Sequence, residues 1–237
     1  MDRPAMKYTA LIGAVVAALA LGGCAKTQTA MDNHNAEIAP DPKDVETEAG
    51  PPLTADTHFA AGQLAESRGD LHAAVTQYQD ALKLDEHHMA TLYRLGCTYV
   101  QLKSYGEAMA VWHRYLEATD NSAFAYSNLA FTEELAGLPQ KAEQDYQRGV
   151  ARDPNNEPCR VNFGLMLARH GRVPEAIIQL QAVLDAAEVH FNIASVYELQ
   201  NRPAMAKLEY KRALAVDPNF ADAKEKLASL GGVESAD

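Results

Sequence analysis

A single alanine position recurs along this chain at a nearly constant interval, and no other feature of the sequence limits the possible folds as strongly. The interval is 34 residues between the first four alanines and 30 before the last, at Ala74, Ala108, Ala142, Ala176 and Ala206. A period of this length accommodates two helices and the turns between them. We therefore expect residues 55–220 to form five copies of one two-helix unit, each packed mainly on its neighbours.

Two more positions keep the same register. A large residue follows each alanine by four positions: Tyr78, Trp112, Tyr146, Leu180 and Tyr210. A glycine or alanine precedes each of the recurring alanines by twelve positions: Gly62, Gly96, Ala130, Gly164 and Ala194. Small residues let the two helices of a unit cross closely, and the large residue fills the gap to the next unit. The pattern resembles the tetratricopeptide repeat. This resemblance implies an all-α fold, a right-handed α-solenoid of about five helix pairs, with a capping helix and tail in residues 221–237.

Glycines mark three of the turns inside the repeats. Gly69, Gly137 and Gly171 lie where a left-handed backbone is expected between two helices. The fourth repeat is four residues shorter than the others. Because one helical turn contains 3.6 residues, loss of one turn near Leu184 and Asp185 would keep the apolar faces in phase.

The chain begins with the features of a secretory signal. Positive charge at Arg3 and Lys7 is followed by an uncharged, mostly apolar stretch that ends in Leu21-Gly22-Gly23-Cys24. This ending resembles the lipobox of bacterial lipoproteins, which implies that residues 1–24 are a lipoprotein signal peptide and that Cys24 is acylated. Several acyl chains are sufficient for stable membrane attachment. The alternative is an uncleaved transmembrane helix, for which the stretch is near the lower length limit.

The residues after Cys24 point to a destination and a spacer. Ala25 stands where an aspartate would imply retention in the inner membrane. The resemblance therefore implies a lipid-anchored protein of the bacterial outer membrane that faces the periplasm. Residues 25–54 are rich in polar residues and proline and nearly lack large apolar side chains, so we expect a disordered tether.

By resemblance, the first helix of every repeat forms the concave wall of the solenoid, and this wall is the candidate binding groove. Asn128, Asn162 and Asn192 hold the sixth position of three successive repeats, and Arg94 holds it in the second. The apolar residues expected around them are Phe59, Tyr93, Phe124, Phe131, Val161, Leu165 and Phe191. Side-chain amides can pair with the backbone of an extended segment, and apolar neighbours can supply affinity, so we expect a protein or peptide segment as ligand.

Two alternatives to this interpretation stay open. Asparagine is common at the sixth position of this repeat in general, so the row can be consensus without a specific use. The apolar lining can also be covered by the capping helix, by the tether or by a second copy of the chain, and self-association is therefore considered as well. The groove lacks a cluster of Lys and Arg, since only Arg94 and Arg169 are available. This absence favours an internal or amphipathic segment over a free carboxyl terminus.

Several classes of function are not expected. The chain has 21 Lys and Arg against 32 Asp and Glu, a net charge of −11, so nucleic acid is an unfavourable partner. No metal-binding spacing, nucleophile elbow, phosphate loop or dinucleotide fingerprint occurs, which predicts neither enzyme activity nor a cofactor. Cys97 and Cys159 lie two repeats apart, too far to bridge without distortion, and are interpreted as small apolar side chains.

The combination of anchor and repeats suggests three functions. Small lipoproteins of this architecture resemble assembly factors of two kinds: the tight-adherence (Flp-type) pilus lipoprotein, which we prefer here, and the pilot lipoprotein of a type IV pilus secretin. We therefore predict a membrane-anchored scaffold in envelope or pilus assembly. The alternatives are a docking regulator of a cell-wall enzyme and a module that serves only oligomerisation.

Overall fold

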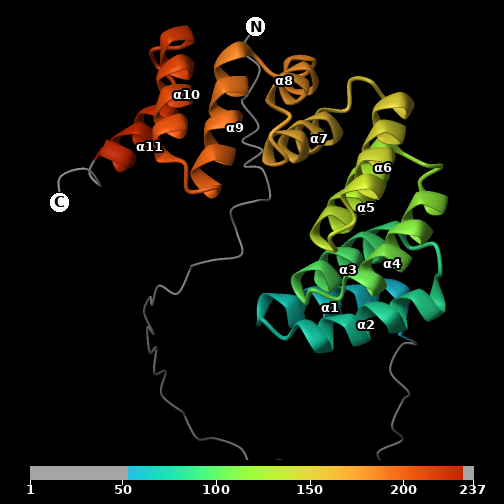
Figure 1. The fold of residues 1–237 in the computed structure, drawn as a ribbon. Helices are drawn as coiled ribbons and strands as arrows, with labels where there is room; N and C mark the ends of the chain where they lie inside the picture. Colours follow the sequence, from blue (N-terminus) through green and yellow to red (C-terminus); the bar gives the residue numbers. More distant parts are fainter. Residues whose placement is uncertain (1–52, 232–237) are drawn as a thin grey trace, which may run out of the picture. The chain divides into compact units, whose positions relative to one another are not determined.

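The computed structural model describes residues 53–231, and within this range the chain forms eleven α-helices and no strand (Figure 1). The first helices of the five pairs are α1 (Ala55–Ser67), α3 (Met89–Gln101), α5 (Ala123–Leu135), α7 (Glu157–Arg169) and α9 (Ala186–Leu199). The second helices are α2 (Leu71–Leu84), α4 (Tyr105–Ala118), α6 (Pro139–Arg152), α8 (Val173–Gln181) and α10 (Pro203–Val216). A final helix, α11 (Ala221–Gly231), follows the fifth pair. The predicted signal peptide 1–24 and all of the predicted tether except residues 53–54 lie outside the described residues.

Side-chain caps explain where the first helices begin. Thr54 and Asp185 each form a capping box, in which the cap side chain and the third helical residue exchange hydrogen bonds with each other's backbone N–H. Ser122 and Asn156 each accept a hydrogen bond from the third backbone N–H of their helix. These caps satisfy N–H groups that would otherwise lack partners at a helix start.

The turn inside each repeat uses one left-handed residue. Gly69, Gly137 and Gly171 have φ angles of 78°, 76° and 79°, so the predicted left-handed turns are confirmed. The same place in the second and fifth repeats is taken by Lys103 and Asn201, with φ angles of 59° and 55°. A residue with a Cβ atom is sterically destabilised in this conformation, and the destabilisation is smaller for asparagine than for lysine.

The core is built from the small and large residues of the repeat. A Cβ atom added at Gly96 would lie 2.6 Å from the ring of Trp112, and one added at Gly164 would lie 2.8 Å from Leu180. Trp112 is 2% exposed, and its Nε1 donates a hydrogen bond of 2.8 Å to Thr132 Oγ1 in the next repeat. Each helix packs on the next along the chain, and α5, α7 and α9 also pack on one another in series. The predicted all-α solenoid of five helix pairs followed by a further helix is confirmed.

The shortened fourth repeat loses its missing residues from α8. This helix has nine residues, whereas the other four second helices have fourteen. Helix α8 ends at Gln181, and the cap of α9 follows at Asp185, close to the predicted deletion point. Helix α7 is packed against α5, α6, α8 and α9, so its residues 163–168 are all buried.

Candidate functional site

The three asparagines of the first-helix wall are half-buried, and each already uses one amide N–H. Asn128 Nδ2 donates to the carbonyl oxygen of Phe124 at 3.0 Å, and Asn192 Nδ2 donates to that of Glu188 at 2.9 Å. Asn162 Nδ2 instead donates to Ser127 Oγ of the preceding repeat at 3.1 Å. Each side chain therefore retains its carbonyl oxygen and one N–H for a ligand, which is less than the full amide that the sequence suggests.

Arg94 is held by an acidic side chain of the first repeat. Its guanidinium forms an ion pair with Glu66, whose side chain is 8% exposed. Glu66 also accepts hydrogen bonds from Tyr78 Oη at 2.8 Å and from Thr98 Oγ1 at 2.6 Å. Burial raises the pKa of Tyr78 to about 12, so its hydroxyl remains a donor at neutral pH. The positive charge of Arg94, whose side chain is 41% exposed, is thus compensated by the buried Glu66.

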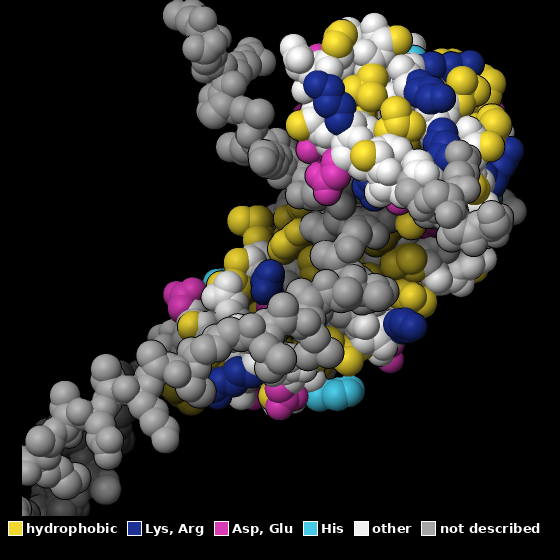
Figure 2. Space-filling view, turned by 90° about the vertical axis from the view of Figure 1, so that its left-hand side faces the viewer, with side chains coloured by type: hydrophobic (Ala, Val, Ile, Leu, Met, Phe, Trp, Pro, Cys, Tyr) yellow, Lys and Arg dark blue, Asp and Glu magenta, His cyan; other side chains and the backbone are white. Residues whose placement is uncertain are grey.

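Arg169, the second cation expected in the groove, is compensated in the same way. Its Nε and Nη2 atoms donate to the two carboxylate oxygens of Glu134 at 2.8 and 2.6 Å. These side chains are 22% and 12% exposed, respectively, so the bidentate pair is partly shielded from water. On the face visible in Figure 2, the Lys and Arg side chains of the described residues are separated by apolar and uncharged ones.

The acidic partners of these cations were not predicted from the sequence. Glu66, Glu134 and Glu198 occupy the same repeat position in the first, third and fifth repeats. Glu198 accepts hydrogen bonds from Tyr210 Oη at 2.7 Å and from Lys226 Nζ of α11 at 3.1 Å. The sequence did contain a signal for these contacts, because a glutamate recurs at the same position of every second repeat. These contacts link each acid to the following repeat or to α11.

Aromatic residues join the first helices of the second and third repeats. The ring centroid of Tyr93 lies 5.7 Å from that of Phe124 and 6.0 Å from that of Trp112. Tyr93, Phe124 and Phe131 are half-buried, so part of each side chain remains accessible. These three residues are exposed enough to line a groove, and their role in binding stays a prediction.

Two of the expected lining residues differ from the sequence interpretation. Leu165 is only 3% exposed, because α7 is enclosed by neighbouring helices, and it belongs to the core instead of the groove. Phe191 packs against Phe220, which lies just before α11, with a centroid distance of 5.0 Å. The end of the wall is therefore partly covered by the segment that leads into the last helix.

Neither described cysteine has the properties of a reactive thiol. Burial raises the pKa of Cys97 to about 11 and that of Cys159 to about 12. Both are free thiols, and Cys159 is fully buried. Their interpretation as small apolar side chains agrees with this environment.

A pair of carboxyl groups is buried between α5 and α6. Glu133 and Asp145 are 5% and 6% exposed, and Asp145 accepts a hydrogen bond of 2.6 Å from Arg148. Burial, followed by the nearby charge of Asp145, raises the pKa of Glu133 to about 7. One oxygen of Glu133 has no hydrogen-bond partner, and a proton shared between Glu133 and Asp145 would satisfy it.

Residues 53–231 contain neither a candidate metal site nor a candidate membrane-spanning helix. In residues 53–231, no three His, Cys, Asp or Glu side chains are grouped in a way that could hold a metal ion. None of the helices in this part of the chain combines the length and the apolar character needed to cross a bilayer.

Comparison with known proteins identifies the repeats and a relative from pilus assembly. The tetratricopeptide-repeat family matches residues 59–123 and residues 187–220. The type IV pilus assembly protein PilF of Pseudomonas aeruginosa is 26% identical over 146 residues, which cover 58% of this chain and 57% of PilF. This chain therefore matches a little over half of the length of that relative.

Solved structures show the same fold at lower sequence identity. A tetratricopeptide-repeat protein from Parabacteroides merdae has a TM-score of 0.55 and 19% identity, covering 75% of this chain and 71% of that protein. The structure of Pseudomonas aeruginosa pilF has a TM-score of 0.51 and 15% identity, covering 74% of this chain and 82% of pilF. Proteins built from this repeat are protein-interaction scaffolds and are generally not catalytic. The chain accordingly carries tetratricopeptide repeats in residues 59–123 and 187–220 and resembles the tetratricopeptide-repeat proteins of pilus assembly.

Proposed function

We propose that this protein is a membrane-anchored adaptor of type IV pilus assembly that receives a polypeptide segment on the wall formed by α1, α3, α5, α7 and α9. The observation that carries the proposal is the similarity to PilF, which is named for type IV pilus assembly. The similarity supports type IV assembly and does not extend to the tight-adherence group that we preferred from the sequence. The partly exposed aromatic residues and asparagines of the wall supply the contacts.

The ligand in this proposal is an internal segment of a protein. Arg94 and Arg169 are each paired with a glutamate that is 8% or 12% exposed. A free carboxyl terminus would have to share each guanidinium with a glutamate that already neutralises its charge, which weakens the attraction. A segment that contributes apolar side chains and uncharged backbone groups meets no such penalty.

Attachment to the outer membrane through acylated Cys24 belongs to the same proposal. It rests on the residues that precede Cys24 and on Ala25 after it. Metabolic labelling with radioactive palmitate and membrane fractionation test it. The wild-type chain should be labelled and sediment with outer membranes, and Cys24→Ala should lose both properties, whereas Cys97→Ala should keep them. A labelled Cys24→Ala variant would refute the anchor.

Deletion of the gene in its own host tests the pilus role. We expect surface pili and secretin multimers to be lost, and both to be restored by the wild-type chain. Normal pili together with altered cell-wall composition would contradict the proposal and favour the regulation of a cell-wall enzyme.

Peptide binding tests the wall itself. Overlapping peptides from the host's secretin and pilus-assembly proteins would be titrated against the full chain. The double variant Asn128→Ala, Asn162→Ala should bind its peptide about tenfold more weakly, because two hydrogen bonds of roughly 0.5–1.5 kcal/mol each are lost. The matched control is Gln140→Ala, Gln144→Ala, which removes two exposed amides from α6. Equal affinity of the wild-type chain and the asparagine variant would show that the asparagines follow the repeat consensus and do not contribute to peptide binding.

A further inference from the structure

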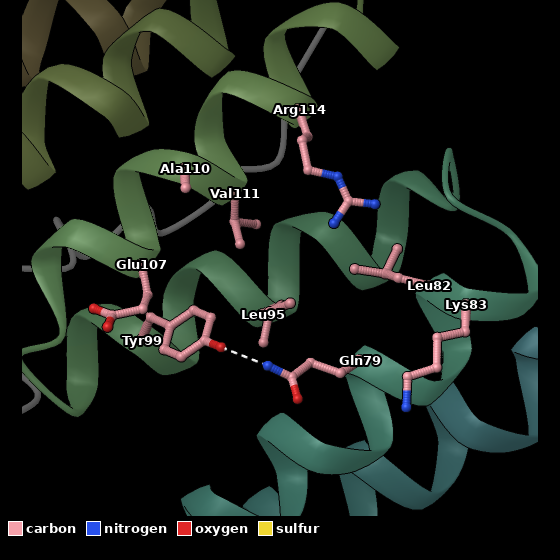
Figure 3. Close-up of a pocket in the computed structure, with 9 residues that line it drawn as sticks. All are labelled: Gln79, Leu82, Lys83, Leu95, Tyr99, Glu107, Ala110, Val111 and Arg114. Atoms are coloured by element: carbon pink, nitrogen blue, oxygen red, sulfur yellow. Dashed lines mark hydrogen bonds between the residues drawn. The ribbon is translucent and has the colours of Figure 1, made fainter.

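Two furrows lie at the same register of the repeat array, between consecutive second helices. The first, between α2 and α4, encloses about 320 Å³, and the second, between α6 and α8, encloses about 300 Å³ (Figure 3 shows the first). Seven of the nine lining residues of each are related by a shift of 68 residues, which equals two repeats. Both volumes are at the lower end of the roughly 300–1,000 Å³ that is usual for ligand pockets.

The second furrow carries an internal cation at one end. Arg172 donates from Nη1 to Glu143 of α6 at 2.8 Å, and from Nε and Nη2 to Glu175 of α8 at 2.7 and 2.5 Å. This guanidinium therefore connects the two second helices across the end of the furrow. Carboxylates on both sides of one Arg satisfy most of its donors.

The first furrow keeps only one of these two acidic groups, since Val75 stands at the position of Glu143, and it lacks the cation. Glu107 takes the place of Glu175, while Ser104 takes the place of Arg172. Glu107 has no hydrogen-bond or ion-pair partner among residues 53–231. Ser104 and Arg172 both precede the first residue of a second helix, with φ and ψ of −82° and 66° for Ser104 and −87° and 52° for Arg172. The backbone is thus the same at both sites, and only the side chain differs.

The remaining surface of the first furrow is apolar in the middle and polar at its two ends. Leu82, Leu95 and Val111 form its floor. Figure 3 shows Glu107 beside Tyr99 at one end and Arg114 at the other, and Tyr99 accepts a hydrogen bond of 2.8 Å from Gln79. Arg114 already donates to the backbone oxygen of Glu86. Lys83 also lines this furrow and pairs with Asp80 at 2.7 Å. Glu107 therefore lacks the arginine partner that its counterpart Glu175 has in the second furrow.

We propose that the furrow between α2 and α4 docks a partner protein through a segment that carries an arginine or lysine beside a large apolar side chain. The cation pairs with Glu107 as Arg172 pairs with Glu175, and the apolar side chain rests on Leu82, Leu95 and Val111. This surface is made mainly by second helices, so it is separate from the wall formed by the first helices. The protein would then hold two polypeptides at once.

Methyl NMR of the full chain with labelled Leu and Val tests the proposal. The probe is the blocked peptide acetyl-Arg-Leu-Leu-amide, and acetyl-Gln-Leu-Leu-amide is its uncharged control. The arginine peptide should shift the methyl signals of Leu82, Leu95 and Val111 and leave those of Val150 and Leu167 in the second furrow unchanged. Its dissociation constant should be about two- to fivefold lower than that of the glutamine peptide, as expected for one exposed ion pair.

Three variants separate docking at Glu107 from nonspecific apolar binding. Glu107→Gln should raise the dissociation constant of the arginine peptide about two- to fivefold, whereas the matched control Glu175→Gln should not change it. Ser104→Arg should weaken binding similarly, because it supplies the cation within the chain. Equal affinity for both peptides, equal shifts in both furrows, no shift at peptide saturation, or an unchanged constant in Glu107→Gln would each overturn the proposal.

Discussion

Replacing Glu133 with glutamine should stabilise the protein at neutral and alkaline pH and leave its stability in acid nearly unchanged. Glu133 is 5% exposed and lies beside the equally buried Asp145. In the unfolded chain its pKa returns to the ordinary value of 4.5, while in the folded protein it is raised to about 7. The folded state therefore binds more protons than the unfolded state between these two values, and stability falls as the pH rises through this window.

The size of the effect follows from the shift in the pKa. A change from 4.5 to about 7 corresponds to about 3 kcal/mol at roughly 1.4 kcal/mol per pKa unit. This is an upper bound, because water penetration and relaxation reduce the penalty of a buried charge. Lys141 and Arg148 also face Glu133 and oppose the shift. Glutamine has nearly the same shape and no charge, so Glu133→Gln should gain between about 1 and 3 kcal/mol above pH 7.

Urea unfolding followed by far-ultraviolet circular dichroism measures this gain at a series of pH values from about 4 to 9. The free energy of unfolding of the wild-type chain and of Glu133→Gln should converge near pH 4 and separate as the pH approaches 7. Glu117→Gln, at an exposed glutamate of α4, is the control and should show no separation. Parallel curves for the wild-type chain and Glu133→Gln across the whole range would refute the shared-proton interpretation.

Three further substitutions test the packing of the array by the same unfolding measurement. Lys103→Gly should stabilise the protein by about 1 kcal/mol, because the backbone at φ 59° no longer carries a side chain; a loss of stability would contradict this. Gly96→Ala should lower the free energy of unfolding by about 1–3 kcal/mol, since its Cβ would lie 2.6 Å from Trp112. An unchanged unfolding midpoint would show that the ring can move. Arg169→Ala should cost about 1–3 kcal/mol, because Glu134 is left 12% exposed without its partner, and the loss should largely disappear when Glu134 is also changed to glutamine.

Local signals in the sequence predicted the helix pairs and several turns. The left-handed turns at Gly69, Gly137 and Gly171 were predictable because glycine is the usual residue in that conformation. The same conformation at Lys103 and Asn201 could be found only from the repeat register, since neither residue signals it alone.

Contacts between repeats were harder to predict, because they depend on how the helices stack. The family position of Leu165 suggested an exposed site, but the packing of α5 and α9 around α7 buries it. The partners of Arg94 and Arg169 lie 28 and 35 residues away, so their neutralisation depends on the stacking of whole repeats. The predicted acylation of Cys24 stays a prediction.

The single tryptophan gives this array a reporter for one interface. Trp112 is the only tryptophan of the chain, and its indole N–H bonds to Thr132 across the junction of the second and third repeats. Its fluorescence therefore reports the separation of those two repeats, whereas the far-ultraviolet circular dichroism of the helices averages over all repeats. If the two probes change at different denaturant concentrations, the array unfolds in parts, as one-dimensional stacks with only neighbour contacts can.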